Sequence, residues 1–205
     1  HHLQQYRCLH YMQYESSHQM PELHAAIVTP LNAHQQLDHS AMHALMAHLA
    51  ANGLDGVVPC GTTGEGPSFS VAERLDIIRC CIKARGSLQI FAGTGCQSLT
   101  DTITLTRAAI DAGADAALVL PPFFYKNAGE AGIIAWYRAV CDALPAHGKI
   151  ILYHIPPMTG VSITPAIIIN QSGVAAVGVP LLPQLAHPNA QQAYQEFKQI
   201  GTHTH

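Results

Sequence analysis

Five consecutive residues, Gly61-Thr62-Thr63-Gly64-Glu65, carry the clearest potential for chemistry, and they directly follow an apolar run over residues 56–60. An apolar run that ends in glycine and hydroxyl residues is typical of a buried strand that opens into a polar loop. In a parallel α/β protein, such a loop lies on the face where ligands bind. The threonine hydroxyls and the unobstructed N–H groups near the glycines could together hold a small carboxylate or an oxyanion.

Two later segments also place polar or aromatic residues after apolar runs: Pro121-Pro122-Phe123-Phe124-Tyr125-Lys126 and Tyr153-His154-Ile155-Pro156-Pro157-Met158-Thr159-Gly160. With residues 61–65 and the Ala72-Glu73-Arg74 that follows, they resemble the signature of the dihydrodipicolinate synthase / N-acetylneuraminate lyase family. The resemblance runs in order from about residue 21 to residue 179. It implies a class I, Schiff-base-forming lyase or aldolase that acts on pyruvate or a related 2-keto acid and needs no metal or organic cofactor.

The resemblance also assigns roles to individual residues. Thr63 and the backbone around Thr62, with Gly61 and Gly64, would hold the pyruvate carboxylate. The alternative is a helix-entry loop that satisfies only its own backbone. Tyr153 would be the proton relay, because a phenol near a keto acid can pass protons while an imine forms. The alternative for Tyr153 is an aromatic core residue at a strand end.

The imine-forming lysine that the resemblance requires is not found. The family places it at the end of the sixth strand, where this sequence reads Val174-Ala175-Ala176-Val177-Gly178-Val179 and then Pro180. None of the four lysines matches that position: Lys83, Lys126, Lys149 and Lys198. Because the lysine amine forms the imine that serves as electron sink, we expect this chain to be impaired or inactive as a lyase. The alternatives are a non-catalytic keto-acid-binding or oligomerising remnant of the family, and a product without a selected function.

Three further positions depart from the family pattern. Phe124 stands where many members carry a relay tyrosine, and strand alternation would point the neighbouring Tyr125 the other way. Met158 stands where synthases that take a carboxylated aldehyde often place arginine, and methionine cannot pair with a carboxylate. His154 replaces the usual asparagine and is either a second polar wall or a packed histidine. The second substrate therefore stays open.

Composition limits the class of protein. A chain of 205 residues, 48% apolar and 11% charged, is long enough for one globular domain with a sizeable core. Its net charge of −3 and the lack of a long basic run argue against nucleic acid as a partner. No apolar run approaches the length of a membrane span. The scattered cysteines lack zinc-type spacing and favour a reducing, cytoplasmic location over a disulfide framework: Cys8, Cys60, Cys80, Cys81, Cys96 and Cys141.

Strand and helix patterns alternate from Leu23 onward. Strand runs end near Thr29, Gly61, Thr94, Pro121, Ile155 and Val179, and helical patterns cover residues 37–52, 71–84, 99–112, 129–144 and 165–170. This alternation predicts a parallel sheet. Without a nucleotide-type glycine motif after the first strand, a (β/α)8 barrel is favoured over a doubly wound sheet. Because eight units need about 250 residues, we expect a partial or incomplete barrel of six strands.

The chain divides into three predicted regions: an irregular leader over 1–19, barrel-like βα units over 20–179, and a proline-rich tail over 180–205 with a short helix at 189–200. Pro180 and Pro183 argue against a central strand in the tail. The simplest account is an internal deletion or frame change that removed the last strands. Because an open barrel leaves strand edges and helix faces uncovered, we expect a homo-oligomer.

Two remaining groups of polar residues have ordinary explanations. His39 and His43 are four residues apart and could share a helix face, but the apolar stripe formed by Leu37, Ala41, Ala44, Leu45 and Leu49 turns them outward. No carboxylate or cysteine completes a ligand set there, so we predict no metal site. Thr94 and Gly95 either line the same mouth as Thr62 or form a simple strand-to-helix turn.

Overall fold

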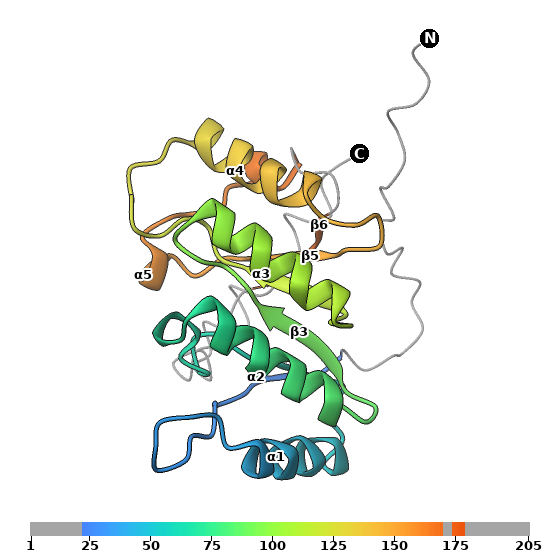
Figure 1. Cartoon of the computed structure of the whole chain (residues 1–205). Helices are drawn as coiled ribbons and strands as arrows, with labels where there is room; N and C mark the ends of the chain where they lie inside the picture. The colour runs from blue at the N-terminus through green and yellow to red at the C-terminus, as the bar shows by residue number, and fades with distance from the viewer. Residues whose placement is uncertain (1–21, 170–173, 179–205) are drawn as a thin grey trace, which may run out of the picture.

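The computed structural model describes residues 22–169 and 174–178. The predicted leader over 1–19 and the predicted tail over 180–205, including its helix and Pro180, lie outside the described residues. The described chain contains six strands: β1 (His24–Ala26), β2 (Gly56–Val58), β3 (Gln89–Gly93), β4 (Ala116–Val119), β5 (Ile150–Tyr153) and β6 (Val174–Gly178). Its helices are α1 (His39–Ala51), α2 (Val71–Ala84), α3 (Leu99–Asp111), α4 (Glu130–Asp142), α5 (Pro156–Thr159) and α6 (Pro165–Ile169), with one 3-10 turn, η1 (Gly66–Ser68) (Figure 1).

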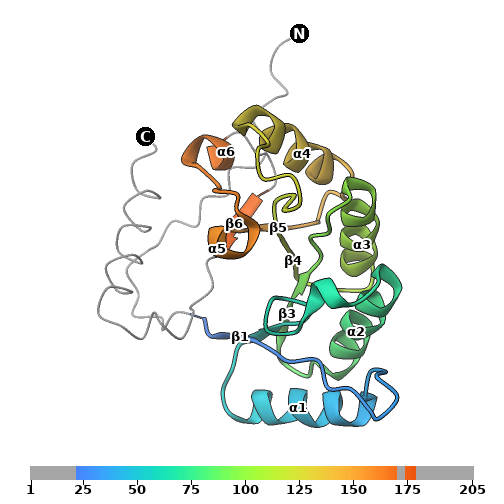
Figure 2. The same ribbon diagram turned by 90° about the vertical axis from the view of Figure 1, so that its left-hand side faces the viewer.

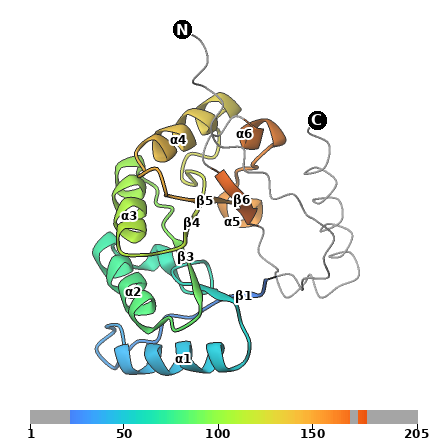
Figure 3. The same ribbon diagram turned by 90° about the vertical axis from the view of Figure 1, so that its right-hand side faces the viewer.

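The sheet confirms the predicted fold class. The strands lie side by side in the order β1-β2-β3-β4-β5-β6, and every neighbouring pair is parallel. Helices α1 to α4 form an arc along the outside of the curved sheet (Figures 2 and 3). Consecutive parallel strands with the helices on one side form a partial (β/α)8 barrel, whereas a doubly wound sheet would carry helices on both faces. Within the described residues, β1 and β6 each pair with one neighbour only.

Explicit capping groups set the helix starts. Ser70 and Glu73 form the predicted capping box: the Ser70 hydroxyl accepts from the Glu73 N–H at 3.3 Å, and a Glu73 carboxylate oxygen accepts from the Ser70 N–H at 2.8 Å. The Ser70 hydroxyl also donates to the Glu73 carboxylate at 2.6 Å, and this bond, together with the one from the Ser70 N–H, lowers the pKa of Glu73. Helix α1 begins at His39 rather than at the predicted residue 37, because the Asp38 side chain caps it by accepting from the Ala41 N–H.

The buried face of α1 differs in part from the predicted stripe. Met42 and Met46 are its fully buried side chains, while Ala44 is exposed. The prediction that His39 and His43 point outward is confirmed, since both are exposed. Methionine periodicity was the missed signal, because Met42 and Met46 are four residues apart and share a helix face.

Two apolar layers lie on opposite faces of the sheet. The larger layer packs the strands against the helices and includes Ala117 and Val119 of β4. The smaller layer contains no helix α1–α4 residue and consists of Ala116, Leu118, Ile151, Tyr153 and Ile155, with Val58, Phe91 and Leu120 against it. Alternate β4 residues therefore face the two layers, as strand geometry requires. The smaller layer lines the inside of the barrel and leads to the carboxyl ends of the strands.

Among the described residues, no helix combines the length and the apolar character needed to cross a bilayer.

Candidate active site

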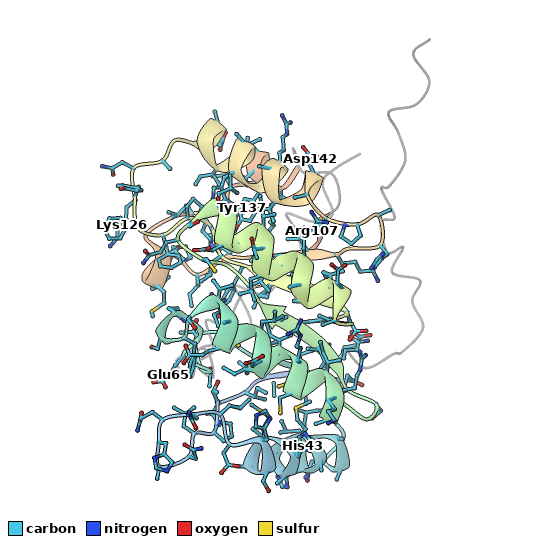
Figure 4. The ribbon with its side chains drawn as sticks, viewed as in Figure 1. His43, Glu65, Arg107, Lys126, Tyr137 and Asp142 are labelled. Atoms are coloured by element: carbon cyan, nitrogen blue, oxygen red, sulfur yellow. The ribbon has the colours of Figure 1, made fainter. Side chains whose placement is uncertain are left out.

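A cavity of about 340 Å³ lies at the carboxyl ends of β2 to β5. Its walls come from the segment between β2 and α2, from the ends of β3 and β4, and from residues 153–159 at the end of β5 and in α5. The carboxyl ends of parallel strands meet at one mouth of a barrel, which is where the sequence placed the site. Figure 4 shows Glu65, on the loop before α2, and Lys126, on the loop before α4, on this side of the molecule.

Thr62 and Tyr153 meet in this cavity. Their hydroxyl oxygens lie 3.3 Å apart, although the residues are 91 positions apart in the chain. Tyr153 is buried, with 8% of its surface exposed, so its phenol reaches the cavity while its ring stays in the inner layer. The two hydroxyls can pass a proton between them, because each is both a donor and an acceptor.

The other residues of the predicted carboxylate loop divide between the cavity and its support. Gly61 lines the cavity, but Thr63 and Gly64 are not among its lining residues. The Thr63 side chain therefore does not reach the cavity beside Tyr153, and the hydroxyl that does so belongs to Thr62. Gly64 anchors the loop to the segment that follows β1, since its carbonyl accepts from the Thr29 hydroxyl at 2.8 Å.

The loop owes its shape to a sharp turn at Cys60. The predicted strand over 56–60 is too long, because β2 ends at Val58 and Cys60 adopts a left-handed φ of 57°. The Cys60 carbonyl then lies against two glycines from other parts of the chain. A Cβ atom at Gly66 would lie 2.1 Å from this oxygen, and one at Gly93 would lie 2.4 Å from it. Both positions therefore need glycine for the loop to close over the end of β3.

Arg74, from α2, lies behind this loop and is 4% exposed. Its guanidinium donates to the Gly93 carbonyl at 2.6 Å and to the Gly95 carbonyl at 3.0 Å, and Nη1 lies 3.2 Å from the Cys96 sulfur. Its Nε is buried without a hydrogen-bond partner within the described residues. In the sequence, Arg74 stands out only as part of the helix signature. In the fold, Arg74 ties α2 to the end of β3 and lines the cavity.

The thiol beside Arg74 is kept protonated. Burial raises the pKa of Cys60 to about 11, and the nearby Arg74 charge offsets only part of that rise. A thiol with so high a pKa is a poor nucleophile at neutral pH. Cys60 therefore acts here through its backbone conformation rather than through its sulfur.

The similarity of the chain to known proteins agrees with this geometry. The sequence profile of the Dihydrodipicolinate synthetase family matches residues 19–178. The chain belongs to this family. It is 52% identical over 145 residues to an uncharacterised DapA-like lyase of Chloroflexus aurantiacus, covering 70% of this chain and 48% of that protein.

Two further comparisons carry more specific names. A 4-hydroxy-tetrahydrodipicolinate synthase of Synechococcus sp. is 42% identical over 142 residues, which cover 69% of this chain and 46% of that protein. The crystal structure of the chloride-inhibited dihydrodipicolinate synthase of Acinetobacter baumannii, complexed with pyruvate, superposes with a TM-score of 0.74 at 27% identity, covering 87% of this chain and 61% of that one. The chain spans about half the length of the curated relatives it matches.

The family's imine chemistry needs a lysine at the cavity. Within the described residues the lysines are Lys83, Lys126 and Lys149, and none of them lines the cavity. Lys149 directly precedes β5, at the opposite end of the strand from Tyr153. The stem of Lys126 lies against Gly160, where an added Cβ would meet its Cδ at 2.8 Å.

The side of the cavity formed by β4, β5 and α5 is mainly apolar. We call the side chains of Leu118, Leu120, Phe123, Ile155 and Met158 the apolar wall, and residues 61–68 of the β2–α2 segment the polar wall. Phe124 and Tyr125 are exposed and do not line the cavity. Their rings contact each other edge to face, with the ring centroids 5.1 Å apart. The expectation that strand alternation would point Tyr125 away from Phe124 is wrong, because β4 ends at Val119.

Two open questions about polar residues are resolved by their hydrogen bonds. Thr94 is fully buried and its hydroxyl lies 2.8 Å from that of Thr106, so it joins β3 to α3, while Gly95 lines the cavity. His154 is a packed histidine: its Nδ1 accepts from the Ile163 N–H at 3.1 Å, and burial lowers its pKa.

Among residues 22–169 and 174–178, no three histidine, cysteine or acidic side chains are placed to hold a metal ion.

Proposed function

We propose that this cavity binds a small 2-keto acid such as pyruvate, in the manner of the class I pyruvate-dependent lyases of its family. The observation that carries the proposal is the pair of hydroxyls of Thr62 and Tyr153, 3.3 Å apart at the carboxyl ends of β2 and β5. A keto acid needs a donor set for its carboxylate and a proton relay for its carbonyl oxygen, and the two groups stand side by side here.

We assign the carboxylate to the loop Gly61-Thr62-Thr63-Gly64. Within the described residues, the N–H groups of Thr62 and Thr63 donate no hydrogen bond, whereas those of Glu65 and Gly66 are used inside the turn. Unused N–H groups beside a cavity are suited to an anion, because they bring partial positive charge without a mobile side chain. Thr63 contributes through its backbone in this proposal, since its side chain does not line the cavity.

We assign the proton relay to Tyr153, with the Thr62 hydroxyl as its partner. The phenol can donate to the keto oxygen while it accepts from Thr62, and the reverse transfer returns the proton. Without a lysine in the cavity, the described part of the chain binds the keto acid but forms no imine. The proposal for this chain is therefore recognition of the first substrate of the family, with lyase turnover impaired.

The test combines binding with covalent trapping. Isothermal titration with pyruvate should give saturable binding, which Thr62→Val and Tyr153→Phe weaken by roughly 2- to 10-fold for one lost hydrogen bond each. Thr100→Val and Tyr125→Phe are matched controls, because both side chains are exposed and lie outside the cavity. Borohydride treatment with pyruvate should leave the intact mass unchanged. Absence of pyruvate binding would overturn the proposal, and an adduct mapped to Lys126 or Lys149 would overturn the claim that no imine forms.

We also propose that the chain self-associates. Within the described residues, β1 and β6 each pair with one neighbour only, and unpaired strand edges of this kind are commonly covered by pairing or packing with another chain. Light scattering coupled to size-exclusion chromatography tests this directly. A monomer at all accessible concentrations would contradict it.

A further inference from the structure

The cavity has more apolar surface than a keto-acid head group requires. Pyruvate has one methyl group beyond its carbonyl, yet the apolar wall presents four hydrocarbon side chains and a thioether. Leu118 and Ile155 are nearly buried, at 8% and 2% exposure, and belong to the packed inner layer. Their positions are fixed by packing, so this part of the cavity is preformed rather than adaptable.

Met158 completes this wall at the mouth of the cavity. It is 62% exposed, and the short helix α5 holds it in place through the Met158 N–H bond to the Ile155 carbonyl at 3.0 Å. The Thr159 hydroxyl donates to the same carbonyl at 3.2 Å and fixes the end of the turn. An exposed, unbranched thioether on a fixed backbone can fold over ligands of different apolar shapes.

The charges around the cavity do not favour a second carboxylate. The charged lining residues are Arg74 and Glu65. Both terminal nitrogens of Arg74 already donate to the Gly93 and Gly95 carbonyls, and its Nε is buried. Glu65 adds a like charge on the polar wall. A ligand with a second carboxylate would therefore lose hydration without gaining an available cation.

We propose that the apolar wall selects keto acids with an aliphatic or aromatic tail and without a second carboxylate. The inference rests on the proposed function, because Thr62 and Tyr153 hold the keto-acid head and thereby direct its tail toward β4 and α5. Each tail carbon that leaves water for this wall strengthens binding, whereas a terminal carboxylate weakens it.

Titration with four keto acids tests the inference: pyruvate, 4-methyl-2-oxopentanoate, phenylpyruvate and 2-oxoglutarate. The two apolar-tailed acids should bind about 10-fold more tightly than pyruvate, since a buried methylene contributes roughly 4-fold and part of that gain is lost in ordering the tail. The dicarboxylate 2-oxoglutarate should bind more weakly than pyruvate. If pyruvate binds and the tails add nothing, the inference fails while the proposed function stands. If none of the four binds, the proposed function itself fails.

The same charge introduced once in the cavity wall and once outside the cavity gives a matched pair of variants. Met158→Arg should shift the affinity ratio of 2-oxoglutarate to 4-methyl-2-oxopentanoate by about 10-fold or more in favour of the dicarboxylate, because it adds a cation at the apolar wall. Tyr125→Arg adds the same charge to an exposed position outside the cavity and should leave this ratio unchanged. Equal shifts in both variants, or none in Met158→Arg, would overturn the assignment. Thermal melting of both variants checks that they fold.

Discussion

The two walls of the cavity are built in different ways. The polar wall is one continuous segment whose shape is set by backbone contacts. The Cys60 carbonyl is enclosed by Gly66 and Gly93, and Thr29 ties the loop to the segment that follows β1. The apolar wall joins two segments that are far apart in the chain, and the burial of side chains such as Leu118 and Ile155 holds it in place. A backbone-built wall tolerates almost no added atom, whereas a wall built by side-chain packing tolerates exchange of apolar groups of similar volume.

Arg74 offers the strongest way to break the polar wall. We expect Arg74→Met to destabilise the protein by roughly 1–3 kcal/mol for each of the Gly93 and Gly95 carbonyls that loses its donor. Arg74→Lys should recover part of the loss, because one ammonium cannot reach both carbonyls as a guanidinium does. Urea unfolding measures the effect, with the exposed Arg79→Met on the same helix as control. If Arg74→Met melts like the wild type, the structural role assigned to Arg74 is wrong.

Gly66 tests how little space the polar wall leaves. A Cβ atom there would lie 2.1 Å from the Cys60 carbonyl, so Gly66→Ala must shift the loop and should cost roughly 1–3 kcal/mol of unfolding free energy. The same change at Gly132, in α4 with nothing within 4 Å, should stabilise the protein by roughly 0.5–1 kcal/mol. Denaturant unfolding of the two variants gives the comparison. Similar values for both would show that the loop is looser than its contacts indicate.

Alkaline pH provides a milder test of the same wall. The folded-state pKa of Cys60, about 11, lies above the ordinary value of 9.0 because burial disfavours the thiolate. The stability that the buried, protonated Cys60 thiol contributes is therefore complete below pH 9 and is lost as pH rises from 9 toward 11. By pH 10 the loss from this group should be about 1 kcal/mol, since one pKa unit corresponds to 1.36 kcal/mol. Chemical unfolding at pH 8 and pH 10 should show a smaller drop in Cys60→Ser than in the wild type. An identical drop would mean that other groups carry it.

The sequence predicted the elements better than the details of the polar wall. The start of α2 could be predicted because Ser70 and Glu73 form a local capping box. The strand order followed from the alternation of strand and helix. The left-handed turn at Cys60 could not be predicted, because the two glycines that pack against its carbonyl, Gly66 and Gly93, are brought there only by the fold. The same limit applies to Thr62 and Thr63: neighbouring residues of one type cannot be ranked until the backbone direction is known.

The apolar wall was predictable only in part. Met158 was recognised as a departure from the family pattern, but its partners come from β4 and its loop, and no local pattern links them to α5. Phe123 rather than Phe124 reaches the cavity, because the chain leaves strand geometry after Val119 and alternation no longer applies. A site whose residues come from distant segments can be identified only once the fold is known, whereas a site formed by one loop can be recognised from its residues.

The smallest expected effect concerns the support of the apolar wall. His154 accepts from the Ile163 N–H through Nδ1 and so fixes the chain just after α5, which carries Met158. Its folded-state pKa lies below the ordinary value of 6.5, because partial burial disfavours the imidazolium. The stability that neutral His154 contributes is therefore complete above pH 6.5 and declines as pH falls below that value toward the folded-state pKa. Protonation of folded His154 also removes the acceptor lone pair, so the Ile163 bond opens as the pH falls to the folded-state pKa.

This effect can be isolated with a side chain that accepts but does not titrate. In His154→Gln the amide oxygen can replace Nδ1 as acceptor, and lowering the pH from 7.5 to 5.5 should depress its melting temperature slightly less than that of the wild type. The affinity for 4-methyl-2-oxopentanoate should follow the same order, because the turn that presents Met158 stays anchored in the variant. Equal losses in both proteins would show that the Ile163 bond does not support the apolar wall, and that packing of Ile155 and Leu118 alone holds it.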